Sequence, residues 1–277
     1  MRGSGEDAVV LWAITEAVAA DTLALFRSWL PLENRPERSV LSSPGAPRDR
    51  VLAGGLLRLA LSRELAMAPP GIELARDRLG KPHLAGEARS RAGPLAFSVS
   101  YSGGAAACVV HRGLQAGIDL ESTARALPPP EIRETFLTPR ERAYLEALRP
   151  ERRDEGFLRL WTLKEAYLKA RGVGLAVRPG SVGFRLPSSP REIPTLEEAA
   201  PEGRAPDPGA SKGETGAPDL VFFQDRLPPR WIVAVAAPRA LARLSFENLL
   251  GHQDGSPVTR VISSVPSCAS GPPGTPV

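Results

Sequence analysis

The chain has 277 residues, 42% of them hydrophobic, so it can bury a full core and fits one bilobal domain or two small ones. Its two cysteines, Cys108 and Cys268, show neither a disulfide framework nor zinc spacing, which indicates a reducing compartment, and no apolar run approaches the ~18 residues that span a bilayer. The formal net charge of +4 favours acidic partners, whether nucleic acid, phosphorylated cofactor or acidic protein surface.

The first part of the chain predicts a strand, two helices and a basic loop. Residues 9–14 form an apolar run that indicates a strand, and acidic residues around it argue against a signal peptide, so we expect a cytoplasmic protein. Residues 21–30 and 51–65 are predicted as helices. The loop between them carries four arginines, Arg35, Arg38, Arg48 and Arg50. It is either a solvated loop or an anion pocket, because guanidinium groups suit phosphate contacts.

A turn and a hairpin follow. Residues 72–75 indicate a short strand that leads into Gly80-Lys81-Pro82, which is either a plain turn or a place where the backbone comes close to a ligand. Residues 95–101 and 105–111 indicate the two strands of a hairpin. His111 has no second His or Cys spaced to join it, so we expect a surface residue rather than a metal ligand.

Residues 117–121, Gly-Ile-Asp-Leu-Glu, alternate apolar and acidic side chains and so indicate the end of a strand. The two-residue period of a strand puts Asp119 and Glu121 on one face. Two parallel carboxylates repel each other unless a cation lies between them, and such oxygens, with a third carboxylate from elsewhere, suit Mg²⁺. A solvated acidic face is the alternative.

Two helices are predicted after a proline-rich loop at residues 122–130. The first covers residues 131–137. The second begins with Thr138 as its cap and Pro139 at its first position, and Glu141 completes a capping-box pattern. Glu141 therefore has a purely structural explanation.

Residues 157–175 predict one amphipathic helix that ends at a glycine. Lys164 falls on its apolar stripe, where a charge costs several kcal/mol unless a partner or ligand compensates it. Glu165 and Lys169 border the same face, an arrangement that suits a metal-bound polyanion. The alternative is a surface pair of Glu165 with Lys169 and a snorkelling Lys164.

The last part of the chain predicts a meander of three strands, at residues 181–186, 220–223 and 231–236. Between the first two, residues 187–219 hold almost no large apolar side chain and are predicted to be a flexible insertion. Residues 251–277 are predicted to be a disordered tail for the same reason.

Together, the segments Gly-Ile-Asp-Leu-Glu and WTLKEAYLKARGVGL resemble the signature pair of the 4′-phosphopantetheinyl transferases, of the longer Sfp type. The resemblance runs from about Arg35 to Ala236. It implies an α+β pseudo-dimer of two similar lobes, each a small antiparallel sheet packed on a long helix, with a ligand cleft between them. We expect the lobes at residues 1–115 and 116–250.

The reaction that this resemblance implies moves 4′-phosphopantetheine from coenzyme A to a serine of an apo carrier protein and releases adenosine 3′,5′-bisphosphate. Polyketide and nonribosomal peptide synthases are the expected source of the carrier. Asp119, Glu121 and Glu165 would hold Mg²⁺ on the pyrophosphate. Lys164 and Lys169 would stabilise the transition state. The serine base would be Glu165, which we favour, a metal-bound water or Glu141, which aligns with a carboxylate near the metal in the family.

The resemblance also implies the residues that bind coenzyme A. They are Arg35, Arg38, Arg50, Lys81, Ser100, Tyr101, Asp119 and Lys169. The three arginines would hold the 3′-phosphate, and Lys81 would lie near the nucleotide. Tyr101 stands where the family usually has a histidine that touches the 3′-phosphate, so it can offer one hydrogen bond but no positive charge.

Two other classes of function remain. A Mg²⁺-dependent phosphohydrolase acting on coenzyme A or a nucleotide would use the same three carboxylates without a protein acceptor. A nucleic-acid binder would have aromatic residues among the basic ones, and residues 35–50 have none. We therefore expect no nucleic-acid partner. We also expect no membrane partner and a monomeric protein. Arg125 and Leu127 are expected to meet the carrier, unless their loop is only a rigid linker.

Overall fold

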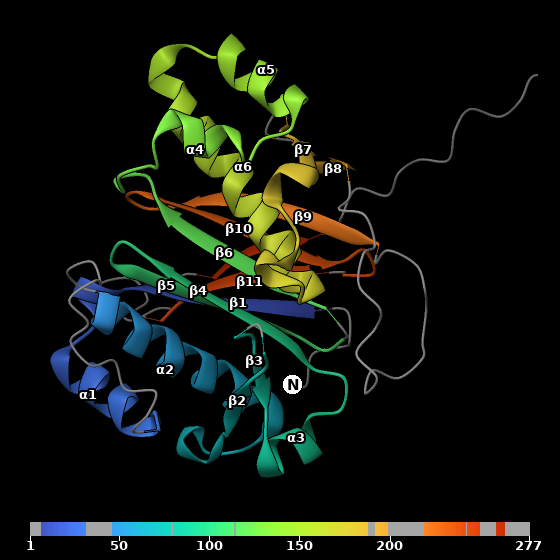
Figure 1. Cartoon of the computed structure of the whole chain (residues 1–277). Helices are drawn as coiled ribbons and strands as arrows, with labels where there is room; N and C mark the ends of the chain where they lie inside the picture. Colours follow the sequence, from blue (N-terminus) through green and yellow to red (C-terminus); the bar gives the residue numbers. More distant parts are fainter. Residues whose placement is uncertain are drawn as a thin grey trace, which may run out of the picture.

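The computed structural model describes residues 7–31, 46–78, 80–113, 115–187, 192–198, 219–241, 243–249 and 259–263. In this part of the chain two main sheets lie face to face, and helices cover their outer faces (Figure 1). The predicted α+β class is therefore confirmed. Arg35 and Arg38 lie outside the described residues, as do large parts of the predicted insertion and tail.

Strand β1 (Asp7–Ile14) lies at the centre of the first sheet. It pairs antiparallel with β5 (Ala105–His111), which pairs antiparallel with β4 (Ala96–Ser102). On its other side β1 pairs parallel with β11 (Arg243–Asn248), and β11 pairs antiparallel with β12 (Thr259–Ser263). The strand order is therefore β12-β11-β1-β5-β4, and the sheet is mixed.

Helices cover the outer face of the first sheet. Helix α2 (Ala46–Leu65) packs on β5, β4 and β1, and α1 (Ala20–Trp29) packs on α2. Alternation along β1 divides its side chains between two cores, because successive residues of a strand point to opposite faces. Leu11 joins the core under α2, whereas Val10 joins the core between the two sheets.

The second sheet has the order β6-β10-β9 and is antiparallel. Its strands are β6 (Gly117–Ser122), β10 (Trp231–Pro238) and β9 (Leu220–Leu227). One face packs against the first sheet, and α6 (Pro150–Arg171) packs on the other face (Figure 1). The result is four layers, in which both long helices lie outside and both sheets lie inside.

Shorter elements connect these layers. Strand β2 pairs with β3, and β7 pairs with β8, in two small antiparallel sheets.

Among the described residues, no helix has both the length and the apolarity that a bilayer crossing requires. The shorter helices are α3 (Gly86–Ala92), α4 (Pro130–Glu134) and α5 (Pro139–Ala147). The shorter strands are β2 (Leu74–Arg76), β3 (Pro82–Leu84), β7 (Gly183–Arg185) and β8 (Thr195–Glu198). The 3-10 turns are η1 (Thr15–Ala17), η3 (Pro69–Gly71), η4 (Gly174–Ala176) and η5 (Pro179–Ser181).

Several predictions from the sequence are wrong at the C-terminal end of the fold. The expected meander does not form, because β7 pairs with β8 and leaves β10 between β6 and β9. Strand β8 lies inside the segment predicted to be a flexible insertion, where Leu196 gives it an apolar contact with the core under α6. Strand β12 lies inside the predicted tail, on the edge of β11. Strand β11, expected in the C-terminal lobe, pairs with β1 and makes the first sheet mixed.

His111 is also not where the sequence predicts it. The side chain is buried rather than at the surface, with 5% of its area exposed. Its neighbours across the sheet are the small residues Ala8 and Ala96, and a side chain at Gly113 would collide with the imidazole ring. Small partners therefore leave the room that the ring fills.

Strand β6 comes very close to α6 at Gly117, the first residue of the strand. A Cβ atom placed there would lie 2.0 Å from the carbonyl oxygen of Ala166 and 2.6 Å from the backbone nitrogen of Ala170. Both atoms belong to the backbone of α6, which cannot move aside as a flexible side chain can. Glycine at position 117 therefore sets how closely β6 approaches α6.

We predict that Gly117→Ala lowers the free energy of unfolding by about 3 kcal/mol or more. Overpacking usually costs about 1–3 kcal/mol, and the cost should be at or above the top of this range here because the added methyl group meets backbone atoms. The midpoint of urea unfolding measures this loss. The matched control is Gly71→Ala, since a Cβ at Gly71 meets nothing within 4 Å. Equal midpoints for the two variants would contradict the close approach of β6 to α6.

Candidate functional site

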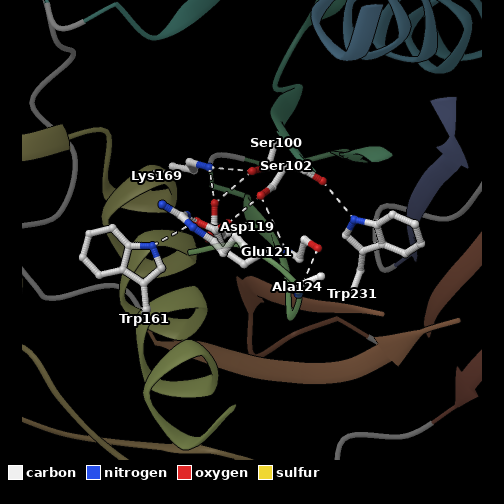
Figure 2. A network of polar contacts seen from close by, with 10 residues as sticks. Ser100, Ser102, Asp119, Glu121, Ala124, Trp161, Lys169 and Trp231 are labelled. Carbon is white, nitrogen blue, oxygen red and sulfur yellow. Dashed lines mark hydrogen bonds and ion pairs between the residues drawn. The ribbon is translucent and has the colours of Figure 1, made fainter. Parts of the chain in front are cut away.

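Four of the predicted site residues, Ser100, Asp119, Glu121 and Lys169, gather where β4, β6 and α6 meet (Figure 2). Ile118 and Leu120 of β6 point into the core between the sheets, so the residues that alternate with them, Asp119 and Glu121, point toward α6. Lys169 reaches this place from the last turn of α6. Three separate elements thus bring carboxylates, hydroxyls and an ammonium group together.

Two serines of β4 hold the two carboxylates of β6 in matched hydrogen bonds. Ser100 Oγ donates to Asp119 Oδ1 at 2.9 Å, and Ser102 Oγ donates to Glu121 Oε2 at 2.6 Å. Both strands use residues two apart, so the serines repeat at the spacing of the acids. Lys169 Nζ donates to Asp119 Oδ1 at 2.6 Å and to Ser100 Oγ at 3.2 Å. This set orients Asp119 from two sides.

Glu121 uses both of its carboxylate oxygens within the protein. Oε2 accepts the hydrogen bond from Ser102, and Oε1 forms an ion pair with Arg125. The indole Nε1 of Trp161 also donates to Oε1, at 3.3 Å. Glu121 is 7% exposed, so water has little access to it.

Two other carboxylate oxygens at the site have no such partners. Asp119 Oδ2 and Glu165 Oε1 are buried and have no hydrogen-bond partner among the described residues. A buried acceptor without a partner costs about 1–3 kcal/mol, so a native protein retains one where a ligand or ion satisfies it. Hard oxygen atoms of this kind fit Mg²⁺. The residues present therefore fit a divalent cation held by Asp119 and Glu165.

Glu121 is not part of a ready-made set of three ligands. No group of three or more His, Cys, Asp or Glu side chains is arranged to hold a metal in the part of the chain that the structure describes. The ion pair with Arg125 gives the physical reason, because it takes up the oxygen that Glu121 would offer. Coordination by Asp119, Glu121 and Glu165 together stays a prediction.

Burial and mutual repulsion change the protonation of these acids. Burial and, to a lesser extent, the negative charge of Asp119 raise the pKa of Glu165 to about 7, although Lys169 opposes the change. Burial also raises the pKa of Asp119, against the attraction of Lys169. The negative form of Glu165 is thus held in balance with its neutral form near neutral pH.

Three further residues predicted to bind coenzyme A are Arg50, Lys81 and Tyr101, and one of them contacts this cluster. The Tyr101 hydroxyl accepts a hydrogen bond from Arg50 Nε at 3.2 Å, and the tyrosine is 37% exposed. Lys81 Nζ donates to the carbonyl oxygen of Lys169 at 2.8 Å, and burial lowers the pKa of Lys81. Lys81 thus contacts Lys169 directly. Tyr101 follows Ser100 in β4, so its side chain points to the opposite face, on the side of α2, where Arg50 meets it. Arg35 and Arg38 lie outside the described residues.

Lys164 and Glu141 do not belong to this site, which corrects their predicted catalytic roles. Lys164 is fully buried, and its ammonium group donates to Glu141 Oε2 at 2.6 Å and to two backbone carbonyls, those of Phe136 and Pro179. Glu141 also accepts from the backbone nitrogens of Thr138 and Phe184. The capping box predicted from Thr138 and Glu141 is confirmed.

Sequence reasoning missed Ser102, Trp161 and Asp49 as residues of the site and gave Arg125 another role, contact with the carrier. Ser102, Trp161 and Arg125 all contact Glu121. Asp49 accepts from Thr15 Oγ1 at 2.5 Å and from the backbone nitrogen of Gly104 at 3.0 Å, so it fixes the turn that ends β4. For Ser102 the two-residue spacing from Ser100 was an available signal. For Asp49 the sequence offered no signal of this role beyond an acidic residue in the first turn of α2.

We predict that Lys164→Met destabilises the fold by about 3–5 kcal/mol, because it leaves a buried carboxylate without its cation. Lys169→Met is the matched comparison, since the side chain of Lys169 is 28% exposed and water can reach Asp119 more easily when it is removed. Urea unfolding of both variants measures the difference. A loss for Lys169→Met as large as that for Lys164→Met would show that the two lysines do not differ in this way.

We predict that the metal-free protein becomes less stable as the pH rises from about 5 to about 8. The ordinary pKa of a glutamate is 4.5, and that of Glu165 is about 7 in the fold. Between these values the folded chain keeps a proton that the unfolded chain has lost, so the free energy of unfolding falls with pH. Urea midpoints in the presence of a chelator, for the wild type and Glu165→Gln, measure this. Parallel curves for the two proteins would contradict the raised pKa.

Comparisons with known proteins identify the family of the chain. A sequence profile described as the 4′-phosphopantetheinyl transferase superfamily matches residues 115–206, which hold β6 and α6. The 4′-phosphopantetheinyl transferase HetI of Nostoc sp. is 36% identical over 149 residues, which cover 53% of this chain and 62% of that protein. The L-aminoadipate-semialdehyde dehydrogenase-phosphopantetheinyl transferase of Eremothecium gossypii is 38% identical over 184 residues, 64% of this chain and 65% of that protein.

The chain therefore spans a little under two thirds of the length of these two relatives. It covers more of a third protein, the 4′-phosphopantetheinyl transferase AcpT of Salmonella typhi. The identity there is 35% over 155 residues, which make up 56% of this chain and 74% of that protein. The chain belongs to the 4′-phosphopantetheinyl transferase superfamily.

Proposed function

We propose that the protein transfers 4′-phosphopantetheine from coenzyme A to a serine of an apo carrier protein. The observation that supports this most is that Lys169 holds one oxygen of Asp119, while the other oxygen of Asp119 and one oxygen of Glu165 are buried and open. A cation-binding pair of acids beside an ammonium group is what the transfer of a pyrophosphate-linked group requires.

In the proposed reaction, the serine hydroxyl attacks the phosphorus of coenzyme A that bears the pantetheine. A new oxygen–phosphorus bond forms, the bond to the bridging oxygen of the pyrophosphate breaks, and adenosine 3′,5′-bisphosphate leaves. Bound Mg²⁺ would neutralise the pyrophosphate and orient the attacked phosphorus. Asp119 and Glu165 would hold the cation. Lys169 would stabilise the oxygens that gain negative charge.

The serine proton goes to a base, and the structure narrows the choice. The contacts of Glu141 argue against it, because it is 2% exposed and already bound to Lys164 and to two backbone amides. Glu165 has a carboxylate oxygen without a hydrogen-bond partner and a pKa of about 7. That pKa belongs to the site without a cation. With a cation on Oε1, the second carboxylate oxygen of Glu165 would take the serine proton, so Glu165 is the proposed base.

The exposed pair of Arg50 and Tyr101 supports a place for the 3′-phosphate of coenzyme A. The tyrosine hydroxyl accepts from Arg50, so its own proton is free to be donated to a phosphate oxygen. The finer parts of the proposal rest on the sequence. We propose that the protein is of the Sfp type, with two lobes, and that it acts as a monomer in the cytoplasm. Its proposed acceptors are the carriers of polyketide and nonribosomal peptide synthases.

We predict that the wild type, incubated with coenzyme A, Mg²⁺ and a panel of apo carriers, adds the mass of phosphopantetheine to at least one of them. Lys169→Met should lower kcat by a factor of about 100 or more, which is typical for the loss of one transition-state donor. Glu87→Gln, a change at an exposed side chain of α3, serves as the control. Cleavage of coenzyme A without any carrier would instead support a phosphohydrolase.

A further inference from the structure

The three acids at the site differ in how their charges are balanced. Asp119 is paired through one oxygen, with Lys169, and its other oxygen is open. Glu165 has an open oxygen as well. Glu121 instead accepts from three side chains, Ser102, Trp161 and Arg125, so both of its oxygens are engaged. Two carboxylates are thus ready for a cation, and the third is occupied by a guanidinium group.

The loop after β6 brings Arg125 to Glu121. Thr123 donates from its backbone nitrogen and from its hydroxyl to the carbonyl oxygen of Arg230, at 2.8 and 3.0 Å. The backbone nitrogens of Ala124 and Arg125 bond back to Ser122, at 3.2 Å each. The loop is therefore fixed to β10 and turned back on itself, which places Arg125 four residues after its partner and on the same side.

The two members of this ion pair are not equally free to leave it. The Arg125 side chain is 39% exposed, whereas that of Glu121 is 9% exposed. The guanidinium group can swing into water while the loop stays in place, but the carboxylate cannot leave the site. A partly exposed ion pair of this kind is worth about 1 kcal/mol or less. A divalent cation gains more from a carboxylate than a single guanidinium does, so an exchange is favourable.

We propose that Arg125 competes with the divalent cation for Glu121, so that Glu121 joins Asp119 and Glu165 as a ligand only after Arg125 has moved away. Arg125 is thus a positioning residue, which acts on the cation through Glu121. This inference rests on the proposed function, since that function requires the cation. It also changes the role expected of Arg125, whose first acidic partner lies in its own chain rather than on the carrier.

The first test measures cation affinity without coenzyme A or carrier. Mn²⁺, which prefers the same oxygen ligands as Mg²⁺, is titrated into the full chain by calorimetry. Arg125→Ala should bind Mn²⁺ about three- to tenfold more tightly than the wild type, because the competitor is gone. Arg125→Lys, which keeps the charge, should stay within about twofold of the wild type. Arg140→Ala removes a charge from an arginine that is 75% exposed, and it should have no effect.

A second variant separates competition from the simple loss of a positive charge. In a Glu121→Gln background no carboxylate remains for Arg125 to hold, so adding Arg125→Ala should change the affinity by less than about 1.5-fold. An equal gain in both backgrounds would show a general electrostatic effect and overturn the proposal. So would an unchanged or weaker affinity of Arg125→Ala, or an absence of Mn²⁺ binding in every variant.

A spectroscopic measurement follows Glu121 directly. The indole N–H of Trp161 donates to the same oxygen of Glu121 as Arg125 does. The NMR signal of this indole proton therefore reports on that oxygen. Addition of Mg²⁺ should shift this signal in the wild type and leave it unmoved in Glu121→Gln. Trp161→Phe identifies the signal among the four tryptophans.

The outcomes also separate this inference from the proposed function. A wild type that shows the expected cation affinities and shifts but modifies no carrier would refute the transferase proposal and leave the competition intact. A wild type that modifies carriers while Arg125→Ala shows the wild-type affinity for Mn²⁺ would refute the competition alone.

Discussion

The close contact of β6 with α6 is the constraint on which the site depends. Strand β6 has one apolar face, toward the other sheet, and one acidic face, toward the helix. The acidic face is useful only if α6 comes near enough for Glu165 and Lys169 to reach it. Gly117 permits that approach at one end of the strand, where backbone meets backbone. At the other end the matched hydrogen bonds from β4 fix the carboxylates, so the first sheet also takes part in the site.

The sequence predicted most of the elements near the site because their patterns are local. Alternation in β6, the apolar stripe of α6 and the cap of α5 each depend on residues within a few positions of one another. The partners of β7, β8, β11 and β12 depend instead on which sheet edges remain open after the rest has folded. No periodicity within a short segment carries that information, which is why the meander was predicted wrongly and why β8 and β12 were not predicted.

The same limit applies to the side chains of α6. The sequence correctly recognised that a lysine on the apolar stripe needs compensation, but it assigned that compensation to a ligand. The structure supplies it from Glu141 and two carbonyl groups, one of them Pro179 in the turn before β7. Adjacent residues on a helix are rotated by about 100° from each other, so Lys164 and Glu165 face different surroundings despite being neighbours. The order of charged residues along the sequence does not distinguish a lysine in a buried ion pair from a lysine at a reactive site.

The parallel pairing of β1 with β11 has a consequence for how the chain is made. The hydroxyl of Ser245 in β11 donates to the carbonyl oxygen of Ala8 in β1, and the two residues are 237 positions apart. The first strand therefore leaves the ribosome long before its neighbour exists. Until then one edge of β1 can pair only with water or with another chain. The hairpin of β4 and β5, the helix α2 and the other edge of β1 can assemble early, but the first sheet is completed only near the end of synthesis. An incomplete chain that stops before β11 is therefore exposed to pairing between molecules, even though its residues around Asp119 and Lys169 are all present.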